Sequence, residues 1–345
     1  MRTIVAPCDP ESIKRAAGLI RSGALVAFPT ETVYGLGANG LNGQAVLRIF
    51  EAKGRPADNP LILHVSRFQD VLPLIDGPLP DHARRLADAF WPGPLTMVLP
   101  RSNLVPDAVT AGLNTVAVRM PSHLAARMLI ESAGVPVAAP SANRSGRPSP
   151  TRAEHVLEDM DGRIDMVLDG GPCEVGLEST VVDMTGELPR ILRPGGVTPE
   201  MIIAALGAVQ VDETAMRPLM EGETARSPGM KYRHYAPKGR LTIVRGGRDE
   251  VVRAIEELYD GATGRGEQCA ILASSKERYG ARRARSLGET PEEAAAALFQ
   301  ALREMDGEGI ERIFAEAVDT AGVGLAVMNR LGRAAAFDIL DVSGR

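Results

Sequence analysis

The sequence predicts an α/β protein with two domains, a larger one on a twisted mixed sheet and a smaller, open one. Three observations predict this architecture. A length of 345 residues exceeds one ordinary domain and suits two. Residues 1–207 and 241–345 both alternate short apolar runs with helical patterns. In addition, 24 of the 25 prolines lie at or before Pro237, which indicates a change of architecture near that residue.

The strands and helices of the larger domain, residues 1–207, follow from hydrophobic patterning. Several runs are apolar at every position, as in strands covered on both faces. The predicted strands are Ala24–Phe28, Leu61–Val65, Leu95–Leu99, Val116–Met120, Val135–Ala139, Met166–Leu168, Thr180–Asp183 and Arg190–Leu192. The predicted helices are Ser12–Arg21, Gln44–Lys53, Asp81–Ala89, Leu124–Ser132, Ala153–Asp159 and Pro199–Leu206. We expect Ser12 and Thr198 to be the N-caps of two of these helices.

Residues 208–240 are predicted to be a linker or lid, because apolar periodicity is weak there while polar and aromatic side chains are dense. Residues 241–345 again alternate strands with helices, which predicts a small, open α/β domain of Rossmann-like type. Its predicted strands are Leu241–Val244, Ala270–Ala273 and Arg312–Ala315. Its predicted helices are Asp249–Leu258, Pro291–Glu304 and Val323–Ala335.

Composition excludes several classes of protein. A net charge of −5 argues against a broadly basic protein that coats nucleic acid. No apolar run reaches the ~18–20 residues of a membrane helix, and the N-terminus lacks the apolar core of a secretory signal. Cys8, Cys173 and Cys269 are too scattered for a disulfide framework or a metal site, so we expect a reducing, cytoplasmic location.

Polar residues follow several predicted strands, at the sheet edge where open α/β proteins bind ligands. Residues 30–34 hold two threonines, a glutamate and a tyrosine. Lys53 and Arg55 stand together on a loop that begins with Gly54, which we expect in a left-handed conformation. Such a pair suits a phosphate, although a solvated helix end favoured by the helix dipole is the simpler interpretation of the pair alone.

Three other positions leave two interpretations open. His64 interrupts an apolar strand and is either a satisfied core histidine or a ligand contact. Arg119 ends a buried strand and needs an anionic partner, either an acidic side chain or a substrate carboxylate. Ser141 and Asn143 lie in a loop that either lets a ligand approach the backbone or is an ordinary Ser/Gly/Pro loop. We expect three helical histidines at the surface, namely His82, His123 and His155.

Common catalytic and nucleotide-binding motifs are missing. No Walker-type phosphate loop, nucleophile elbow, HExxH or zinc-finger spacing occurs. The three glycines Gly35, Gly37 and Gly40 formally match a dinucleotide-binding fingerprint, but no acidic ribose partner ends a second strand about 20 residues later. These absences narrow the options to a site built from the strand-end loops.

Six ordered segments resemble the threonylcarbamoyl-AMP synthase family: FPTETVYGLGAN, KGRPADNPLILHV, TVAVRMP, APSANRSGRPS, GLESTVVD and ILRPGG. They lie within residues 5–207, which resemble the YrdC-like catalytic domain of that family. The segment SPGMKYRHYAP and the unit after it resemble the longer, two-domain members. The resemblance therefore spans nearly the whole chain.

The resemblance implies an L-threonylcarbamoyladenylate synthase, a nucleotidyltransferase that joins ATP, L-threonine and bicarbonate or CO₂ and releases pyrophosphate. The product would feed a downstream machinery that forms threonylcarbamoyladenosine in tRNA. Mg²⁺ would be held largely by the ATP phosphates, with no metal ligand from the protein. Neither membrane association nor stable nucleic-acid binding is implied.

The matching motifs also imply site residues, position by position. L-Threonine would contact Thr32, His64, Arg119, the backbone of Ala139, and Ser179. ATP would contact Arg55, Asn59, Thr115, Ser141, Asn143, Ser149, Arg193 and Tyr235. Lys53 and Arg55 would be catalytic, because they would neutralise the phosphates. In the linker, Tyr232, His234 and Tyr235 would cover the bound nucleotide.

Two alternatives remain. A module that binds double-stranded RNA or tRNA without synthase activity would use basic residues, namely Lys53, Arg55, Arg144 and Arg147, but the negative net charge counts against it. A carbamoyltransferase maturation protein would pass the carbamoyl group elsewhere. Proteins of that kind resemble longer chains with zinc-finger and acylphosphatase-like modules, which this sequence lacks.

Overall fold

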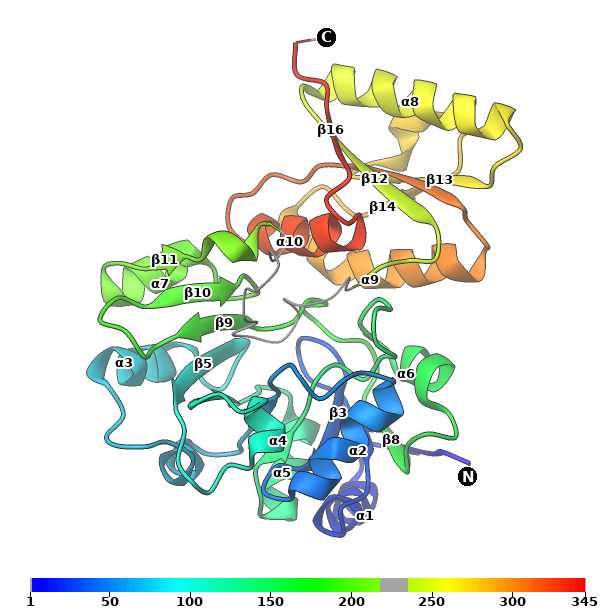
Figure 1. The fold of residues 1–345 in the computed structure, drawn as a ribbon. Helices are drawn as coiled ribbons and strands as arrows, with labels where there is room; N and C mark the ends of the chain where they lie inside the picture. The colour runs from blue at the N-terminus through cyan, green and yellow to red at the C-terminus, as the bar shows by residue number, and fades with distance from the viewer. Residues whose placement is uncertain (1, 218–234, 345) are drawn as a thin grey trace. The chain divides into compact units, whose positions relative to one another are not determined.

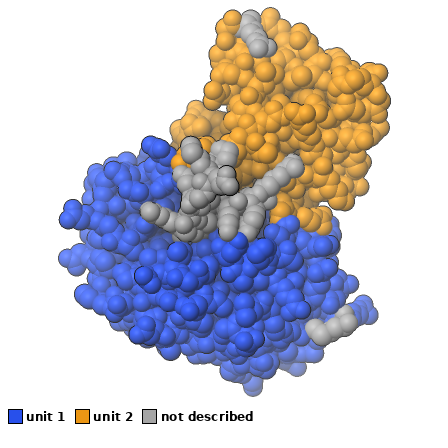
Figure 2. Space-filling model, viewed as in Figure 1, with its two compact units in different colours: residues 1–145, 149–215, 219–231 blue, residues 146–148, 216–218, 232–345 orange. Residues whose placement is uncertain are grey.

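The computed structural model describes residues 2–217 and 235–344, which form two compact units (Figures 1 and 2). Unit 1 comprises residues 2–145 and 149–215, and unit 2 comprises residues 146–148, 216–217 and 235–344. No helix within these described ranges is long and apolar enough to cross a membrane.

Unit 1 is built on a mixed sheet of 11 strands in the order β1-β8-β2-β3-β7-β4-β6-β5-β9-β10-β11. The sheet contains both parallel and antiparallel pairs, which confirms the predicted mixed α/β architecture. In chain order the strands are β1 (Ile4–Pro7), β2 (Val26–Phe28), β3 (Gly35–Asn39), β4 (Ile62–His64), β5 (Leu95–Pro100), β6 (Thr115–Arg119), β7 (Val137–Ala138), β8 (Met166–Asp169), β9 (Thr180–Asp183), β10 (Arg190–Arg193) and β11 (Gln210–Val211).

The helices of unit 1 include all six that the sequence predicts. They are α1 (Pro10–Arg21), α2 (Gly43–Lys53), α3 (Asp81–Phe90), α4 (Asp107–Thr110), α5 (Leu124–Ala133), α6 (Ala153–Met160) and α7 (Pro199–Leu206), with 3₁₀ turns η1 (Phe68–Leu74) and η2 (Glu213–Ala215). The side chain of Thr198 caps α7, as predicted. The prediction for Ser12 is wrong, because Asp9 caps α1 and its carboxylate accepts from the amide of Ser12 over 2.8 Å.

Strand β3 was not predicted, although its residues lie in the first polar motif. Its glycines have a low strand propensity, so the sequence pattern does not predict a strand there, but they are needed for packing. A Cβ on Gly37 would lie 2.8 Å from the ring of Phe28 and 2.9 Å from Val137. The strand therefore pairs with β2 and β7 as it does because Gly37 lacks a side chain. Gly54, by contrast, has the predicted left-handed conformation, with φ 63°, at the end of α2.

The two faces of the sheet around β4, β5, β6 and β9 differ in what they bury. One face carries the main core, to which alternate residues such as Leu63, Met97 and Val118 belong. The opposite face carries a separate small cluster consisting of Ile62, Val98, Ala117, Val181 and Leu192. Side chains alternate along a strand, so polar residues two positions from this small cluster share its face.

Unit 2 contains a five-stranded parallel sheet in the order β14-β13-β15-β12-β16. The strands are β12 (Arg240–Arg245), β13 (Cys269–Ala273), β14 (Ala284–Ser286), β15 (Arg312–Glu316) and β16 (Ile339–Asp341). Helix α8 (Arg248–Gly264) lies on one face, and α9 (Pro291–Gly307) and α10 (Gly324–Ala334) lie on the other, with η3 (Lys276–Tyr279) before β14 (Figure 1). This arrangement confirms the predicted open α/β type and adds β14 and β16.

The predicted linker or lid, residues 208–240, is described only in part. Strand β11 and turn η2 lie within it, and β11 pairs with β10 of the unit 1 sheet. Tyr232 and His234 lie outside the described residues. Tyr235 is described in unit 2, where it is buried with φ 64° and its ring centre lies 5.3 Å from that of Phe299.

Candidate active site

Three neighbouring strands of unit 1 carry polar side chains in one row across the sheet. His64 on β4 is the register partner of Arg119 on β6, and Arg119 is the register partner of Thr96 on β5. Side chains of register partners project to the same face of a sheet. The sheet therefore brings together His64 and Arg119, which were predicted as threonine contacts from separate motifs.

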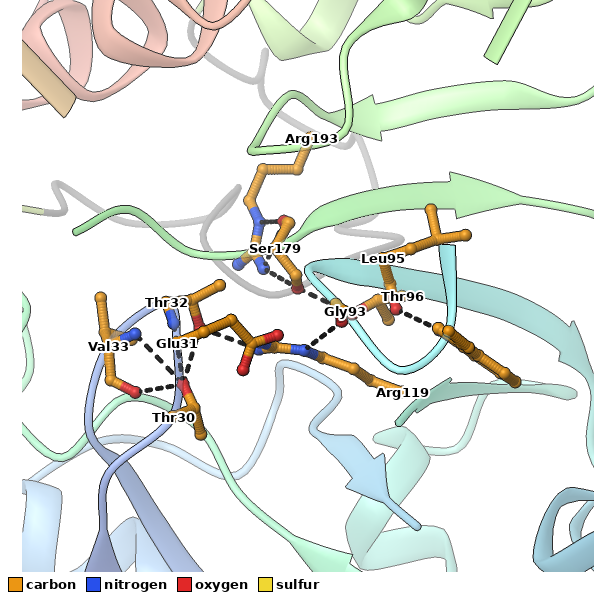
Figure 3. A network of polar contacts seen from close by, with 11 residues as sticks. Thr30, Glu31, Thr32, Val33, Gly93, Leu95, Thr96, Arg119, Ser179 and Arg193 are labelled. Carbon is orange, nitrogen blue, oxygen red and sulfur yellow. Dashed lines mark hydrogen bonds and ion pairs between the residues drawn. The ribbon is translucent and has the colours of Figure 1, made fainter. Parts of the chain in front are cut away.

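The guanidinium of Arg119 is held by three groups (Figure 3). Its Nη2 lies 2.7 Å from Oε1 of Glu31, and both side chains are buried, with 4% and 5% of their surface exposed. Its Nη1 donates to Oγ1 of Thr32 over 2.9 Å, and its Nε donates to the carbonyl of Gly93 over 3.3 Å. In this structure the anionic partner that a buried arginine requires is thus Glu31.

Thr32 is oriented by the turn that precedes β3. The hydroxyl of Thr30 donates to the carbonyl of Val33 over 2.6 Å and accepts from the amides of Thr32 and Val33, each over 3.2 Å. The two threonine hydroxyls lie 2.8 Å apart (Figure 3). Since the proton of Thr30 is already used, Thr32 donates to Thr30 and accepts from Arg119.

The charges in this row differ from those of free side chains. Burial, together with the charge of Arg119, lowers the pKa of His64 to about 3, so the ring is neutral at neutral pH. Its Nδ1 has no hydrogen-bond partner among the described residues. Burial raises the pKa of Glu31, but the charge of Arg119 and hydrogen bonds to the carboxylate together outweigh burial and hold that pKa below its usual value. The resting site therefore contains one cation, one anion and a neutral imidazole.

Ser179, another predicted threonine contact, stands immediately before β9 and next to this row. Its hydroxyl oxygen lies 2.7 Å from Oγ1 of Thr96, and both side chains are buried. Its carbonyl accepts from Nε and Nη2 of Arg193 over 3.1 and 3.0 Å (Figure 3). Arg193, predicted as an ATP contact, therefore also fixes the backbone of a predicted threonine contact.

The loop after β7 is tied to the end of α2 by Lys53. The ammonium of Lys53 donates to the carbonyls of Ser141 and Asn143 over 2.5 and 2.6 Å. The hydroxyl of Ser141 donates to Oδ1 of Asn143 over 2.5 Å, and the amide of Ser145 donates to the carbonyl of Lys53 over 3.0 Å. The structure thus joins two motifs predicted to contact nucleotide, and it gives Lys53 a positioning contact with the loop.

Two other predicted nucleotide contacts, Asn59 and Thr115, lie at the opposite ends of β4 and β6 from His64 and Arg119. Thr115 begins β6, four residues before Arg119, and at ~3.3 Å per residue this is a separation of about 13 Å. Asn59 is fully buried just before β4, and the guanidinium of Arg55 lies 5.7 Å from the ring centre of Phe50. Asn59 and Thr115 therefore lie at the opposite end of this sheet region from His64 and Arg119. Arg193, by contrast, lies at the threonine end, beside Ser179.

Three remaining candidates have different surroundings. The amide of Ala139 donates to the carbonyl of Ile62 over 2.9 Å, so its backbone lies beside the first residue of β4. The hydroxyl of Ser149 donates to Oε1 of Glu178 over 2.5 Å, and both side chains are buried. Tyr235 belongs to unit 2.

The floor between the two ends is apolar. Ile62 and Ala117 separate His64 and Arg119 from Thr115, and Val98 and Val181 extend the same surface across β5 and β9. Polar interactions made above such a floor are strengthened, because water is a poor competitor there. The sheet thus supplies polar groups at two ends and an apolar surface between them.

Several side chains that form the site were not predicted from the sequence. Glu31 was noticed only as one carboxylate of its motif, and its pairing with Arg119, 88 positions later, leaves no local signal. Thr96 did leave a signal, since it is a single polar residue in an apolar strand, as His64 is. Glu178 is a third missed group. The prediction of a surface position for His155 is wrong, because its ring is buried and accepts from the amide of Thr151 over 3.2 Å.

Comparisons with known proteins match both units. A family model described as "Telomere recombination" (Sua5, YciO and YrdC) matches residues 18–195, and one described as the C-terminal domain of threonylcarbamoyl-AMP synthase matches residues 197–336. The threonylcarbamoyl-AMP synthase of Pyrococcus abyssi is 52% identical over 333 residues and covers 96% of each chain. That of Bacillus subtilis is 47% identical over 332 residues and covers 95% of this chain and 93% of its own.

A solved structure is similar over the same extent. The crystal structure of P. abyssi Sua5 complexed with L-threonine has a TM-score of 0.93 and 50% identity, and the match covers 99% of both chains. Family models, near-full-length relatives and a two-unit structure agree, and the chain therefore belongs to the threonylcarbamoyl-AMP synthase family.

Proposed function

We propose that this chain converts L-threonine, bicarbonate or CO₂, and ATP into L-threonylcarbamoyl-AMP and pyrophosphate. One observation carries the proposal. The buried row of His64, Arg119 and Thr96 shares one sheet face with Thr115, with an apolar floor between them. An enzyme that joins two substrates needs polar groups that hold each of them, spaced so that the reacting atoms meet.

Threonine would bind at the Arg119 end. Its carboxylate would meet the guanidinium, because a planar, buried arginine is the side chain best suited to bind a carboxylate with two hydrogen bonds. The unpartnered Nδ1 of the neutral His64 and the hydroxyls of Thr32 and Ser179 would serve the remaining polar groups. The backbone of Ala139 would border this pocket on the side that faces the nucleotide.

ATP would bind toward the other end, along the loop that Lys53 holds. Arg55, Asn59, Thr115, Ser141, Asn143, Ser149 and Arg193 would supply its contacts, as the family motifs suggest. Mg²⁺ would be bound with the substrate, held by phosphate oxygens. Within residues 2–217 and 235–344, no three His, Cys, Asp or Glu side chains gather as ligands, so the chain's own donors do not suggest a separate metal centre there.

The chemistry requires positioning more than a protein nucleophile. The nitrogen of threonine would form a carbamate with bicarbonate or CO₂, and a carbamate oxygen would attack the α-phosphorus and displace pyrophosphate. Holding both partners in line can supply ~7–11 kcal/mol of the barrier. Cations near the phosphates would stabilise the charge that develops in the transition state. The product would serve a tRNA-modifying transferase in the cytoplasm, where the three free cysteines would stay reduced.

The test is pyrophosphate release from ATP by the purified chain, with and without L-threonine and bicarbonate. We expect release only when both are present, and a product that combines the masses of threonine, carboxyl and AMP. Pyrophosphate release that does not depend on threonine would overturn the proposal. Salt-sensitive RNA binding without any threonine-dependent release would favour the alternative of a nucleic-acid-binding module.

A further inference from the structure

The ion pair between Glu31 and Arg119 occupies the place where the proposed function puts the carboxylate of threonine. Nη2 of Arg119 lies 2.7 Å from Oε1 of Glu31, while its other nitrogens already serve Thr32 and Gly93. Arg119 is the main partner of the Glu31 carboxylate, and backbone groups of Glu31 and Ser122 contribute less to its lowered pKa. A carboxylate that binds Arg119 with two hydrogen bonds would therefore share the guanidinium with Glu31 or displace it.

A displaced Glu31 would be a buried anion without its partner, which costs several kcal/mol per ion in proteins. The charges of the substrate can replace the lost partner. Threonine is a zwitterion, so each molecule delivers one carboxylate and one ammonium to a site in which Arg119 and Glu31 form an ion pair. His64 adds no charge to this balance, because its pKa is far below neutral. One internal ion pair can thus be exchanged for two ion pairs with the substrate.

We propose that Glu31 binds the ammonium group of L-threonine while Arg119 binds its carboxylate. This inference rests on the proposed function and adds a residue that recognises the amino group. In the absence of substrate the two side chains satisfy each other, and in its presence each takes the opposite charge of the amino acid. The neutral partners Thr32 and Gly93 hold the guanidinium in place during the exchange.

The exchange also explains selectivity between ligands. A hydroxy acid without an amino group offers Arg119 a carboxylate but leaves Glu31 unpaired, so it has to bind far more weakly than threonine. Without the carboxylate of Glu31 this penalty disappears. The Glu31→Gln variant is therefore expected to lose affinity for threonine and to lose its discrimination against the hydroxy acid.

The experiment measures binding of two ligands by calorimetry, L-threonine and (R)-3-hydroxybutanoate, which is threonine without its amino group. We expect the wild-type chain to prefer threonine by at least tenfold, and Glu31→Gln to reduce that preference several-fold while binding the hydroxy acid no worse. Glu31→Asp, which keeps the charge on a shorter side chain, is expected to retain part of the preference.

A matched control is Asp165→Asn. Asp165 is a partly buried acid of unit 1 that pairs with Arg48 at 3.6 Å and accepts from the amide of Leu25, away from the row of His64 and Arg119. Its loss should leave the preference unchanged. An equal loss of both ligands in Glu31→Gln, or an unchanged preference, would overturn the inference and make Glu31 only a positioning partner of Arg119. If the wild-type chain binds threonine yet releases no pyrophosphate, the proposed function fails, whereas the binding test still decides the role of Glu31.

Discussion

The ammonium of Lys53 lies 2.6 Å from the carbonyl oxygen of Asn143, and 2.5 Å from that of Ser141. Lys53 is buried, so these two hydrogen bonds form where water competes poorly. A lysine that the family motif suggests as a phosphate neutraliser is therefore also the clamp that shapes a predicted nucleotide-binding loop.

Removing this clamp should affect stability and ATP together. In Lys53→Met the two carbonyls lose a charged donor, and each such loss costs about 1–3 kcal/mol, so we expect a drop of roughly 2–6 kcal/mol in the free energy of unfolding. The KM for ATP should rise more than the KM for threonine. Urea denaturation and steady-state kinetics measure both effects. The control Lys14→Met removes an exposed lysine of α1 and should change neither; a stable Lys53→Met with an unchanged KM for ATP would contradict the clamp.

Replacing Arg119 alone should lower the stability of the fold more than replacing both members of the buried ion pair. Arg119→Met leaves Glu31 buried without its cation, which we expect to destabilise unit 1 by about 3–5 kcal/mol. The double variant Glu31→Gln with Arg119→Met removes both charges and should recover much of that loss. Neither protein should bind threonine in calorimetry. A double variant as unstable as the single one would show that the uncompensated charge is not the cause.

The buried imidazole of His64 should make the fold sensitive to acid. The pKa of this ring is lowered from 6.5 to about 3, so between these values the unfolded chain binds a proton that the native chain does not. Stability is therefore unaffected by this group above pH 6.5 and falls as the pH drops through the window, by up to about 1.4 kcal/mol per pH unit.

Denaturation curves at several pH values between 7 and 4 test this dependence. His64→Gln is expected to be less stable at pH 7 but to show a flatter decline, since it has no proton to gain. The control His82→Gln, on α3, keeps the ring of His64 and should keep the steep decline. Parallel slopes for the wild-type chain and His64→Gln would assign the acid sensitivity to other groups.

The sequence was most informative where hydrophobic patterning is strong. The runs 61–65 and 116–120 cover β4 and all but the first residue of β6. Within them His64 and Arg119 were recognised because a polar residue in an apolar strand needs a partner. The pairing of Arg119 with Glu31 depends on strands far apart in the chain and is invisible to local patterns. Strand β3 was missed for the opposite reason, since its glycines oppose strand propensity while the packing of Phe28 and Val137 requires them.

The second glycine-dependent contact lies at the site itself and gives a sharp test of how the backbone positions Ser179. A Cβ on Gly195 would lie 2.3 Å from the amide nitrogen of Thr180 and 2.5 Å from the carbonyl carbon of Ser179. Backbone cannot give way as a flexible side chain does, so Gly195→Ala must push the start of β9 away. We expect a loss of roughly 1–3 kcal/mol in stability, as for other overpacked positions, and a several-fold weaker affinity for threonine.

Gly186→Ala is the matched control, because a Cβ there would meet nothing closer than 3.8 Å. It should keep wild-type stability and threonine affinity in the same denaturation and calorimetry experiments. The contact also predicts which of two variants loses more affinity for threonine. Ser179→Ala removes one hydroxyl, whereas Gly195→Ala displaces that hydroxyl together with the carbonyl that Arg193 holds. Gly195→Ala should therefore weaken threonine binding at least as much as Ser179→Ala does, and a harmless Gly195→Ala would mean that the backbone of Ser179 does not position the substrate.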